Sequence, residues 1–409
     1  MLARYFTITL LGVTMSSIMP TYGRLPVAFQ RGDGAYLYDN QERRYIDGVS
    51  GIAVTNLGHT HAAVTEAVCE QMHTLAHTSN LYRIAPQEML ATLLTSATGM
   101  EQVFFCNSGA EGNEAAIKLA RCYGHERGID IPHIIVLEGA FHGRTMGALA
   151  ATGNPKIQQA FEPMLSGFVR APRDDIAAIH AIADLNPNVV AILLEPVQGE
   201  GGVRQLNSDY LMQLRALCDQ LGWLLMFDEV QSGNGRCGAL YAFQRLGVIP
   251  DVLVTAKGLG NGIPIGACMA RGAAAQVLGP GDHGTTYGGN FIACSAGTAV
   301  ITTLVKDRLW ERADPIREAL LAGFHRTLKY PDVVSEIRGL GLMIGIELNM
   351  PCDQIVTTAL AEGLLVNMTA GNTVRLLPPL VMSLADAQLL GSGVAEVINT
   401  LYSDIEVAS

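Results

Sequence analysis

An acid and an amine stand at the ends of two neighbouring apolar segments of this chain. The segment WLLMFD ends on Asp228, and Lys257 follows directly after the segment DVLVTA. Ligands of open α/β sheets bind at the carboxyl ends of the strands, so we expect the two side chains to emerge beside each other. A lysine amine condenses with an aldehyde, and a carboxylate keeps a nearby heterocyclic nitrogen protonated. The pair therefore predicts covalent chemistry on a bound aldehyde.

Pyridoxal phosphate is the cofactor that this pair would suit, because its protonated ring accepts the electrons released when a substrate loses its α-proton. The lysine has to act as a base near neutral pH, so its pKa should be lowered by burial and by a cationic neighbour. The alternative is a capping aspartate and a solvated loop lysine. The glycines of GLGNG after Lys257 favour the cofactor, because they let the backbone approach the ring closely.

A phosphate site is predicted where a strand ends at Cys106 and the segment CNSGAEGNEAAIKLAR begins. Ser108, Gly109 and Ala110 lead into a helix there. The free amides at its start and its dipole suit a dianionic phosphate. The alternative is an ordinary serine cap with Glu111 at the third helical position.

Five further side chains are candidates for the same crevice. Phe141 and Arg144 stand in EGAFHGRTMGA, Glu195 and Glu200 in EPVQGEGG, and Arg375 in TVRLLPPL. An amino-acid substrate requires an aromatic ring on the cofactor face and a guanidinium that binds a carboxylate through two hydrogen bonds. Each position alone is more often structural than catalytic, but together they predict one site.

Composition and motifs argue against several other kinds of site. The 409 residues include 27 basic and 38 acidic side chains, a formal charge of −11, without a basic cluster that could follow nucleic acid. GPGDHG (279–284) has the letters of a dinucleotide fingerprint, yet proline occupies its turn and no helix signal follows. His59 and His61 lack a cysteine or carboxylate at ligand spacing, so we interpret them as a helix entry and predict no metal.

The cysteines and the first residues bear on the compartment. None of the eight cysteines forms a CxxC pair, and several lie in apolar runs, so we interpret them as buried free thiols of a cytoplasmic protein. Residues 1–18 hold an apolar run that is too short to span a bilayer and lacks a clear cleavage site. We interpret them as an over-extended start or a disordered leader, and we predict no membrane partner.

The elements that must position these residues alternate between strand and helix periodicity from about Gln102 to Ala270, as parallel α/β sheets require. The expected strands are the apolar runs at 102–106, 133–138, 189–195, 223–228, 251–256 and 265–270. After about Val305, a long helical stretch, three apolar strand signals and a helix from near Ser383 predict a smaller α+β unit. The N-terminal hairpin GAYLYDNQERRYIDG has no sheet of its own, so we expect it to join that unit.

The chain resembles a known family through several motifs in order. NSGAEGNEAAIKLAR, AFHGRTMGAL, EPVQGEGGV, FDEVQSGNGRCG, AKGLGNGIPIGA and HGTTYGGN are similar to those of the class III aminotransferases of pyridoxal-phosphate fold type I, among them the acetylornithine aminotransferases. The resemblance implies a large α/β domain with a mostly parallel seven-stranded sheet flanked by helices, plus a smaller α+β domain. The expected boundaries are 1–18 for the leader, 19–50 and 306–409 for the small domain, and 51–305 for the large one.

The resemblance also implies which residues bind the cofactor. Lys257 would carry it covalently, Asp228 would hold its ring nitrogen, and Gln231 would lie near its phenolic oxygen. Phe141 would stack on its ring. Its phosphate would contact Ser108, Gly109 and Ala110 of the same chain, and Thr286 of a neighbouring subunit. That last contact implies a homodimer with shared sites.

Substrate contacts implied by the resemblance come from five residues. Arg144 and Thr285 would bind the substrate, and Tyr22 would close the pocket. Arg375 and Glu200 would form a switch that admits either an amine donor or a dicarboxylate. We find one departure that bears on stability: Gly112 stands where the family usually has alanine, at a cost of about 1 kcal/mol of helix stability.

The activity implied is transfer of the δ-amino group of N2-acetylornithine to 2-oxoglutarate, which yields glutamate. Succinylornithine or succinyldiaminopimelate transamination differs from it only in the acyl pocket, and ornithine or 4-aminobutyrate transamination only in the donor. An aminomutase or a dialkylglycine decarboxylase would be another reaction class on the same fold. A binding protein without catalysis is the remaining alternative, against which Lys257 and Asp228 argue.

Overall fold

The structure is a computed structural model of the chain, and it describes residues 17–349 and 353–408. Residues 1–16 of the expected leader lie outside the described residues. Within the described part, no helix is both long and apolar enough to cross a membrane.

A seven-stranded, mostly parallel sheet forms the centre of the molecule, with the strand order β4-β12-β11-β10-β7-β5-β6. Only β12 runs antiparallel to its two neighbours. The strands are β4 (Gln102–Cys106), β5 (His133–Leu137), β6 (Phe168–Ala171), β7 (Val189–Leu194), β10 (Leu224–Asp228), β11 (Val252–Thr255) and β12 (Gly266–Ala270). The α/β fold implied by the resemblance is thus confirmed, and six of the strands lie where the apolar runs predict them.

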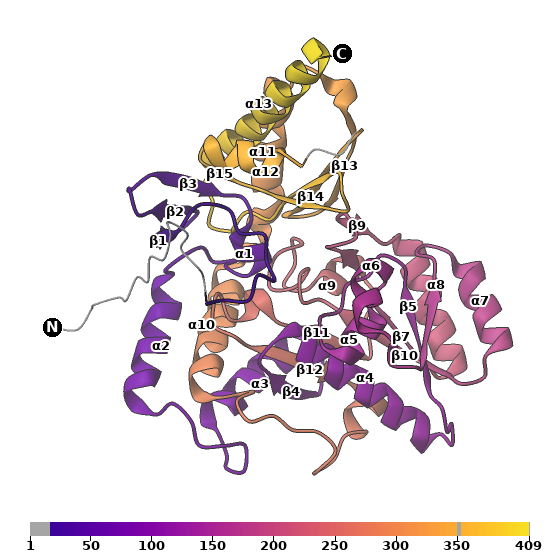
Figure 1. Ribbon diagram of the computed structural model, residues 1–409. Coiled ribbons are helices and arrows are strands. Elements are labelled where there is room, and N and C mark those ends of the chain that lie inside the picture. The colour runs from indigo at the N-terminus through magenta and orange to yellow at the C-terminus, as the bar shows by residue number, and fades with distance from the viewer. Residues whose placement is uncertain (1–16, 350–352, 409) are drawn as a thin grey trace.

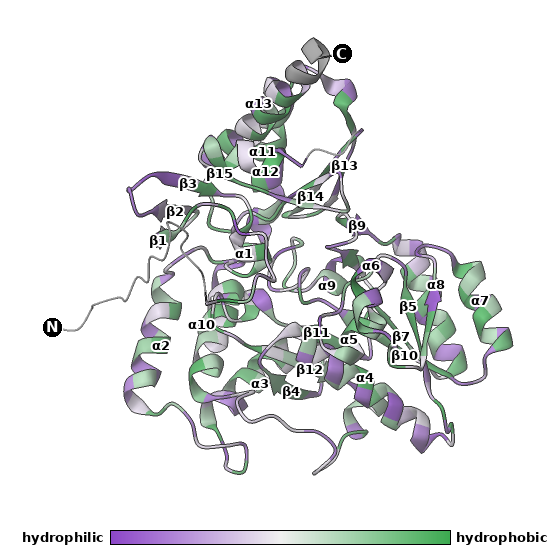
Figure 2. Cartoon of the chain, in the orientation of Figure 1, coloured by the Kyte–Doolittle hydropathy of each residue, from purple (hydrophilic) through white to green (hydrophobic). Residues whose placement is uncertain are grey.

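The two faces of this sheet are covered by different helices, as the alternation of side chains along a strand requires. Leu225 and Phe227 of β10 pack in one core with α8 (Ser208–Leu221). Leu224 and Met226 face the other way and pack in a second core with α4 (Gly109–Glu126). Figure 2 shows these strands in predominantly hydrophobic colours. A strand buried on both faces has to be apolar throughout, which is why β7 and β10 read as continuous runs.

The seventh strand, β6, was not predicted from the sequence. It is an edge strand that pairs only with β5, and its four residues FVRA include an arginine. Because an edge strand is half covered, it needs no long apolar run and gives no strong signal.

The other helices of this part flank the sheet or connect its strands. They are α1 (Ser50–Ala53), α2 (Ala62–Thr74), α3 (Ala85–Thr98), α5 (Met146–Ala151), α6 (Pro155–Gln158), α7 (Ile176–Leu185), α9 (Ala242–Leu246) and α10 (Phe291–Asp307). A two-stranded ribbon, β8 (Val197–Gln198) and β9 (Arg204–Gln205), follows β7.

The C-terminal part contains an antiparallel sheet of order β13-β14-β17-β16. Its elements are α11 (Ala313–Thr327), β13 (Val334–Leu340), β14 (Met343–Leu348), α12 (Ile355–Ala361), β15 (Leu364–Leu365), β16 (Asn367–Thr369), β17 (Thr373–Leu376) and α13 (Leu384–Ala408). The N-terminal strands β1 (Phe29–Asp33), β2 (Tyr36–Asp39) and β3 (Arg44–Asp47) form another sheet with β15, beside α13 in Figure 1. The hairpin therefore pairs with the C-terminal part, while the division at residue 305 stays a prediction.

Seven free cysteines lie in the described residues, and five of them are buried. The expectation of buried thiols is wrong for Cys69, which is exposed on α2, and for Cys122, which is partly exposed on α4. Both helices present one face to solvent, and a cysteine is small enough to stand there.

Gly112 of α4 packs against the central sheet, and this changes what alanine would do there. A Cβ at Gly112 would lie 2.7 Å from Val254 Cγ1 of β11. Alanine should gain about 1 kcal/mol of helix propensity but lose about 1–3 kcal/mol through overpacking. We predict that Gly112→Ala lowers the free energy of unfolding, measured with denaturant. As a control, Val254→Ala should destabilise the Gly112→Ala protein less than the wild type, and a more stable Gly112→Ala protein would contradict the contact.

Candidate active site

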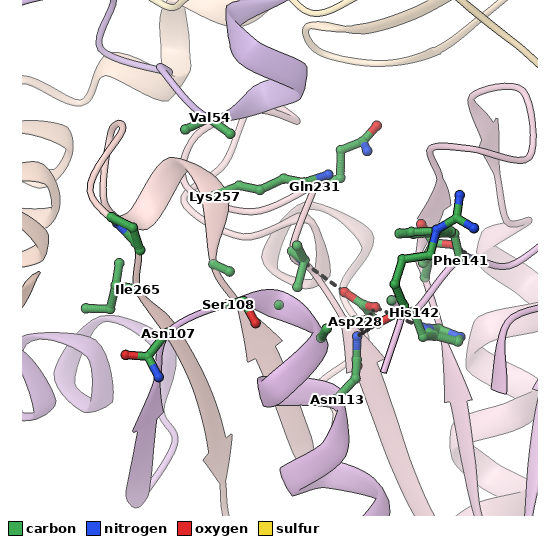
Figure 3. A pocket seen from close by; sticks show the side chains of 18 of the residues that line it. Val54, Asn107, Ser108, Asn113, Phe141, His142, Asp228, Gln231, Lys257 and Ile265 are labelled. Atoms are coloured by element: carbon green, nitrogen blue, oxygen red, sulfur yellow. Dashed lines mark hydrogen bonds and ion pairs between the residues drawn. The ribbon is translucent and has the colours of Figure 1, made fainter. Parts of the chain in front are cut away.

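A cavity of about 470 Å³ opens at the carboxyl ends of the central strands, where the sequence predicts the site. Its wall includes the start of α4, the loop after β5, the ends of β7 and β10, and the turn after β11. Nine predicted residues line it: Ser108, Gly109, Ala110, Phe141, Arg144, Glu195, Asp228, Gln231 and Lys257. Figure 3 shows most of them around the same space.

Asp228 is a buried carboxylate held from three sides. Its even position on β10 turns it to the face covered by α4, where Asn113 Nδ2 donates to Oδ2 at 2.7 Å. His142 Nδ1 lies 2.8 Å from the same oxygen, and the Val230 amide donates to Oδ1 at 3.0 Å. These contacts fix the orientation of a carboxylate that lines the cavity, as Figure 3 shows. A ring nitrogen in the cavity would find a preorganised anion there.

Lys257 begins a short 3-10 turn directly after β11, with a left-handed φ of 45°. Parallel pairing sets Asp228 opposite Val254, so the lysine leaves its strand beside the acid. Buried amides hold the neighbouring backbone: Asn234 Nδ2 donates to the Ala256 carbonyl at 3.1 Å. The ordered backbone around it supports a conformation that a lysine rarely adopts.

The amine of Lys257 reaches into the cavity towards Gln231 in Figure 3. Desolvation lowers the pKa of Lys257, and the Arg375 guanidinium also lowers it, while the carboxylates of Glu200 and Asp228 oppose the shift. The net lowering makes the amine a better nucleophile and base near neutral pH.

The start of α4 has a serine cap and also faces the cavity. Ser108 caps the helix, because its hydroxyl accepts from the Glu111 amide at 3.2 Å. The amides of Gly109 and Ala110, the first two helical residues, have no partner within the helix and stand at the cavity. Gly109 is required there, since a Cβ would lie 2.6 Å from Val230 Cγ1. The serine cap is therefore present, and it leaves the amides of Gly109 and Ala110 at the cavity.

Glu195 is a second buried acid beside Asp228. Its carboxylate accepts from the Phe141 amide at 2.8 Å and from the Gly199 amide at 3.2 Å. Burial raises the pKa of Glu195 to about 8, and the Asp228 carboxylate makes the next largest contribution to this rise. Glu195 thus anchors the loop that carries Phe141 to the end of β7.

Arg375 of β17 joins this cavity through Gln231. Arg375 Nη1 donates to Glu200 Oε1 at 2.6 Å and to Gln231 Oε1 at 3.2 Å. Burial of Glu200 would raise the pKa of its carboxyl, but the Arg375 charge and hydrogen bond lower it below its usual range. Arg375 and Glu200 form an ion pair at the edge of the site.

Five predicted residues do not line the cavity. Two of them, Arg375 and Glu200, are connected to it through Gln231, whereas Thr285, Thr286 and Tyr22 are not. Thr285 contacts a residue that lines the cavity, because its hydroxyl accepts from Asn107 Nδ2 at 3.3 Å. Thr286 is exposed on the loop that follows, and Tyr22 is 76% exposed near the N-terminus. Their proposed roles rest on the resemblance and not on a contact within this chain.

Asn113 and His142 were missed by the sequence reasoning, although both contact Asp228. Asn113 is a polar residue on the buried face of α4, and that pattern could have indicated it, since buried polar groups require partners. His142 follows Phe141 directly and gave no separate signal. The described residues contain no group of three His, Cys, Asp or Glu side chains that could hold a metal.

Comparison with known proteins identifies the family. Residues 18–398 match the model of the aminotransferase class-III family. This chain is a class III aminotransferase. The aminotransferase is 53% identical to the acetylornithine aminotransferase of Nitrosomonas europaea over 94% of this chain and 98% of that protein.

Solved structures agree with this aminotransferase in fold. The acetylornithine aminotransferase of Elizabethkingia anophelis superposes with a TM-score of 0.83 at 32% identity, covering 93% of this chain and 96% of that one. An ornithine aminotransferase of Toxoplasma gondii, with PLP at partial occupancy in its active site, gives a TM-score of 0.88 at 31% identity, covering 94% and 93%. Enzymes with different donors thus share this fold.

In the cofactor-free aminotransferase, Lys257→Met should increase the free energy of unfolding at neutral pH. Because burial lowers the pKa of Lys257, the folded chain binds this proton more weakly than the unfolded chain. The destabilisation is full at low pH and fades as the pH rises towards the ordinary lysine range. Urea unfolding at several pH values should therefore show a gap between the two proteins that narrows with increasing pH. Parallel curves would contradict the desolvation of this amine.

Proposed function

We propose that this chain is a pyridoxal-phosphate-dependent acetylornithine aminotransferase. It would transfer the δ-amino group of N2-acetylornithine to 2-oxoglutarate in two half-reactions. The observation that carries the proposal is the meeting of Lys257, Asp228 and the free amides of Gly109 and Ala110 around one cavity. Identity of 53% to an acetylornithine aminotransferase supports the choice of donor.

The residues present fit pyridoxal phosphate by the chemistry of their donors. The amides at the start of α4 would hold its phosphate, Asp228 its ring nitrogen, and Phe141 and Val230 line the space for the ring. When bound, the cofactor supplies an aldehyde that takes up amino groups and a ring that accepts electrons from the reacting carbon.

Lys257 would supply both the attachment point and the base. Its lowered pKa leaves the amine free to take a proton from the carbon that bears the donor's amino group, and to return it later. Asn113 and His142 keep Asp228 aimed into the cavity throughout. All three side chains are buried, which strengthens these electrostatic contacts.

Arg144 would bind the carboxylate of the donor. Its guanidinium carbon lies 5.7 Å from the centroid of the Phe141 ring, and the side chain is exposed at the cavity mouth. An exposed guanidinium loses little hydration before it binds, and it can grip a carboxylate through two hydrogen bonds. Arg375 would bind the second carboxylate of 2-oxoglutarate once Glu200 moves away.

A homodimer is part of the proposal, with Thr286 reaching the phosphate of the partner's cofactor. Asn80 Nδ2 donates to the carbonyls of Thr285 at 3.2 Å and Gly288 at 3.0 Å, which joins two loops. Leu81 and Tyr287 on these loops are 87% and 63% exposed. Large apolar side chains at one exposed place favour contact with another subunit. We further place the enzyme in the cytoplasm, where its free thiols would stay reduced.

The function is tested with a panel of amine donors and 2-oxoglutarate as acceptor. N2-acetylornithine should give the highest kcat/KM, exceeding ornithine and 4-aminobutyrate by about tenfold or more, because neither rival fills an acyl pocket. Lys257→Ala should reduce the rate to background with every donor. Highest kcat/KM for ornithine, or release of carbon dioxide, would contradict the proposal. Succinylornithine in the same panel decides between the two acyl groups.

A further inference from the structure

The buried guanidinium of Arg375 contacts the neutral side chain of Asn367 as well as the carboxylate of Glu200. Asn367 of β16 stands directly opposite Arg375 of β17 in the antiparallel pair. Asn367 Oδ1 accepts from Arg375 Nε at 3.0 Å and from Nη2 at 2.6 Å. Because arginine has donors only, the amide must present its oxygen. One neutral oxygen therefore holds two of the donors of this guanidinium.

This arrangement divides the guanidinium into a fixed side and a free side. Nε and Nη2 are occupied by Asn367, whereas Nη1 points to Glu200 and Gln231. The Arg375 side chain is 1% exposed, and that of Glu200 is 37% exposed. Of the two side chains in this ion pair, Glu200 is the one with space to move away.

The backbone of Glu200 is held while its side chain is partly exposed. Thr369 Oγ1 donates to the Glu200 carbonyl at 2.5 Å, and Arg338 Nε donates to the Gly202 carbonyl at 2.8 Å. The carboxylate can therefore turn away without movement of the loop. When it does, Arg375 keeps its orientation through Asn367 but has no carboxylate bound among the described residues.

We propose that Asn367 is a positioning residue that determines specificity for the oxo-dicarboxylate acceptor. It keeps Arg375 oriented but does not neutralise it, so the full positive charge becomes available each time Glu200 leaves. A carboxylate at position 367 would neutralise Arg375 permanently and compete with the acceptor. The inference rests on the proposed function and names the residue behind its second half-reaction.

The test compares Asn367→Asp with wild type in each half-reaction separately, followed by the absorbance of the bound cofactor. Asn367→Asp should lower kcat/KM for 2-oxoglutarate about tenfold or more relative to its effect on the amine donor, because an added charge opposes a dicarboxylate at close range. The loss should lie mainly in KM. The dissociation constant of glutarate, an unreactive dicarboxylate, should rise by a similar factor in calorimetry, which measures binding without turnover.

Two further variants make the outcome specific. Thr357→Asp adds the same charge at the exposed first turn of α12, where an acidic side chain stabilises the helix. It should change neither the relative kcat/KM of the two half-reactions nor the dissociation constant of glutarate. Asn367→Ala removes the oxygen without adding charge, and should weaken glutarate binding less than Asn367→Asp does. Equal losses in both half-reactions of Asn367→Asp, or unchanged glutarate binding, would overturn the inference. Wild-type protein that fails to use 2-oxoglutarate would instead overturn the proposed function.

Discussion

The parallel register of β10 and β11 is the constraint on which the site depends. Asp228 pairs with Val254, and Lys257 follows three residues later, just beyond the end of β11 at Thr255. The acid and the amine therefore lie side by side at the carboxyl ends of two adjacent strands, although 29 positions separate them in sequence. The same edge receives the start of α4, because α4 packs across the face to which Asp228 points. One pairing thus brings the Asp228 carboxylate, the Lys257 amine and the free amides of α4 around one cavity.

Charge balance in this cavity follows from burial. Asp228, Glu195 and Glu200 contribute carboxyl groups, whereas Lys257 and Arg375 contribute the cations. Desolvation disfavours each charge, and the protein responds differently at each place. It raises the pKa of Glu195 to about 8, lowers that of Lys257, and keeps Glu200 ionised through Arg375. Acids and bases with separated pKa values are what proton transfer at neutral pH requires.

Much of this arrangement could be predicted from the sequence, because strand ends are marked by apolar runs that stop at a polar residue. Asp228 and Lys257 are such residues, and both line the cavity. The positions that escaped prediction depend on distant neighbours. Asn113 and His142 acquire their roles only by meeting Asp228, and β6 is recognisable only by its pairing with β5. The effect of alanine at Gly112 likewise depends on Val254, which no local pattern reveals.

We propose that the cofactor binds covalently to one amine, that of Lys257. The direct measurement is to incubate the purified protein with pyridoxal phosphate, reduce it with borohydride, digest it and locate the label by mass spectrometry. We expect one dominant labelled peptide, with the added mass on Lys257, and loss of that label in Lys257→Ala. Labelling spread over surface lysines, or a dominant label on another residue, would contradict it.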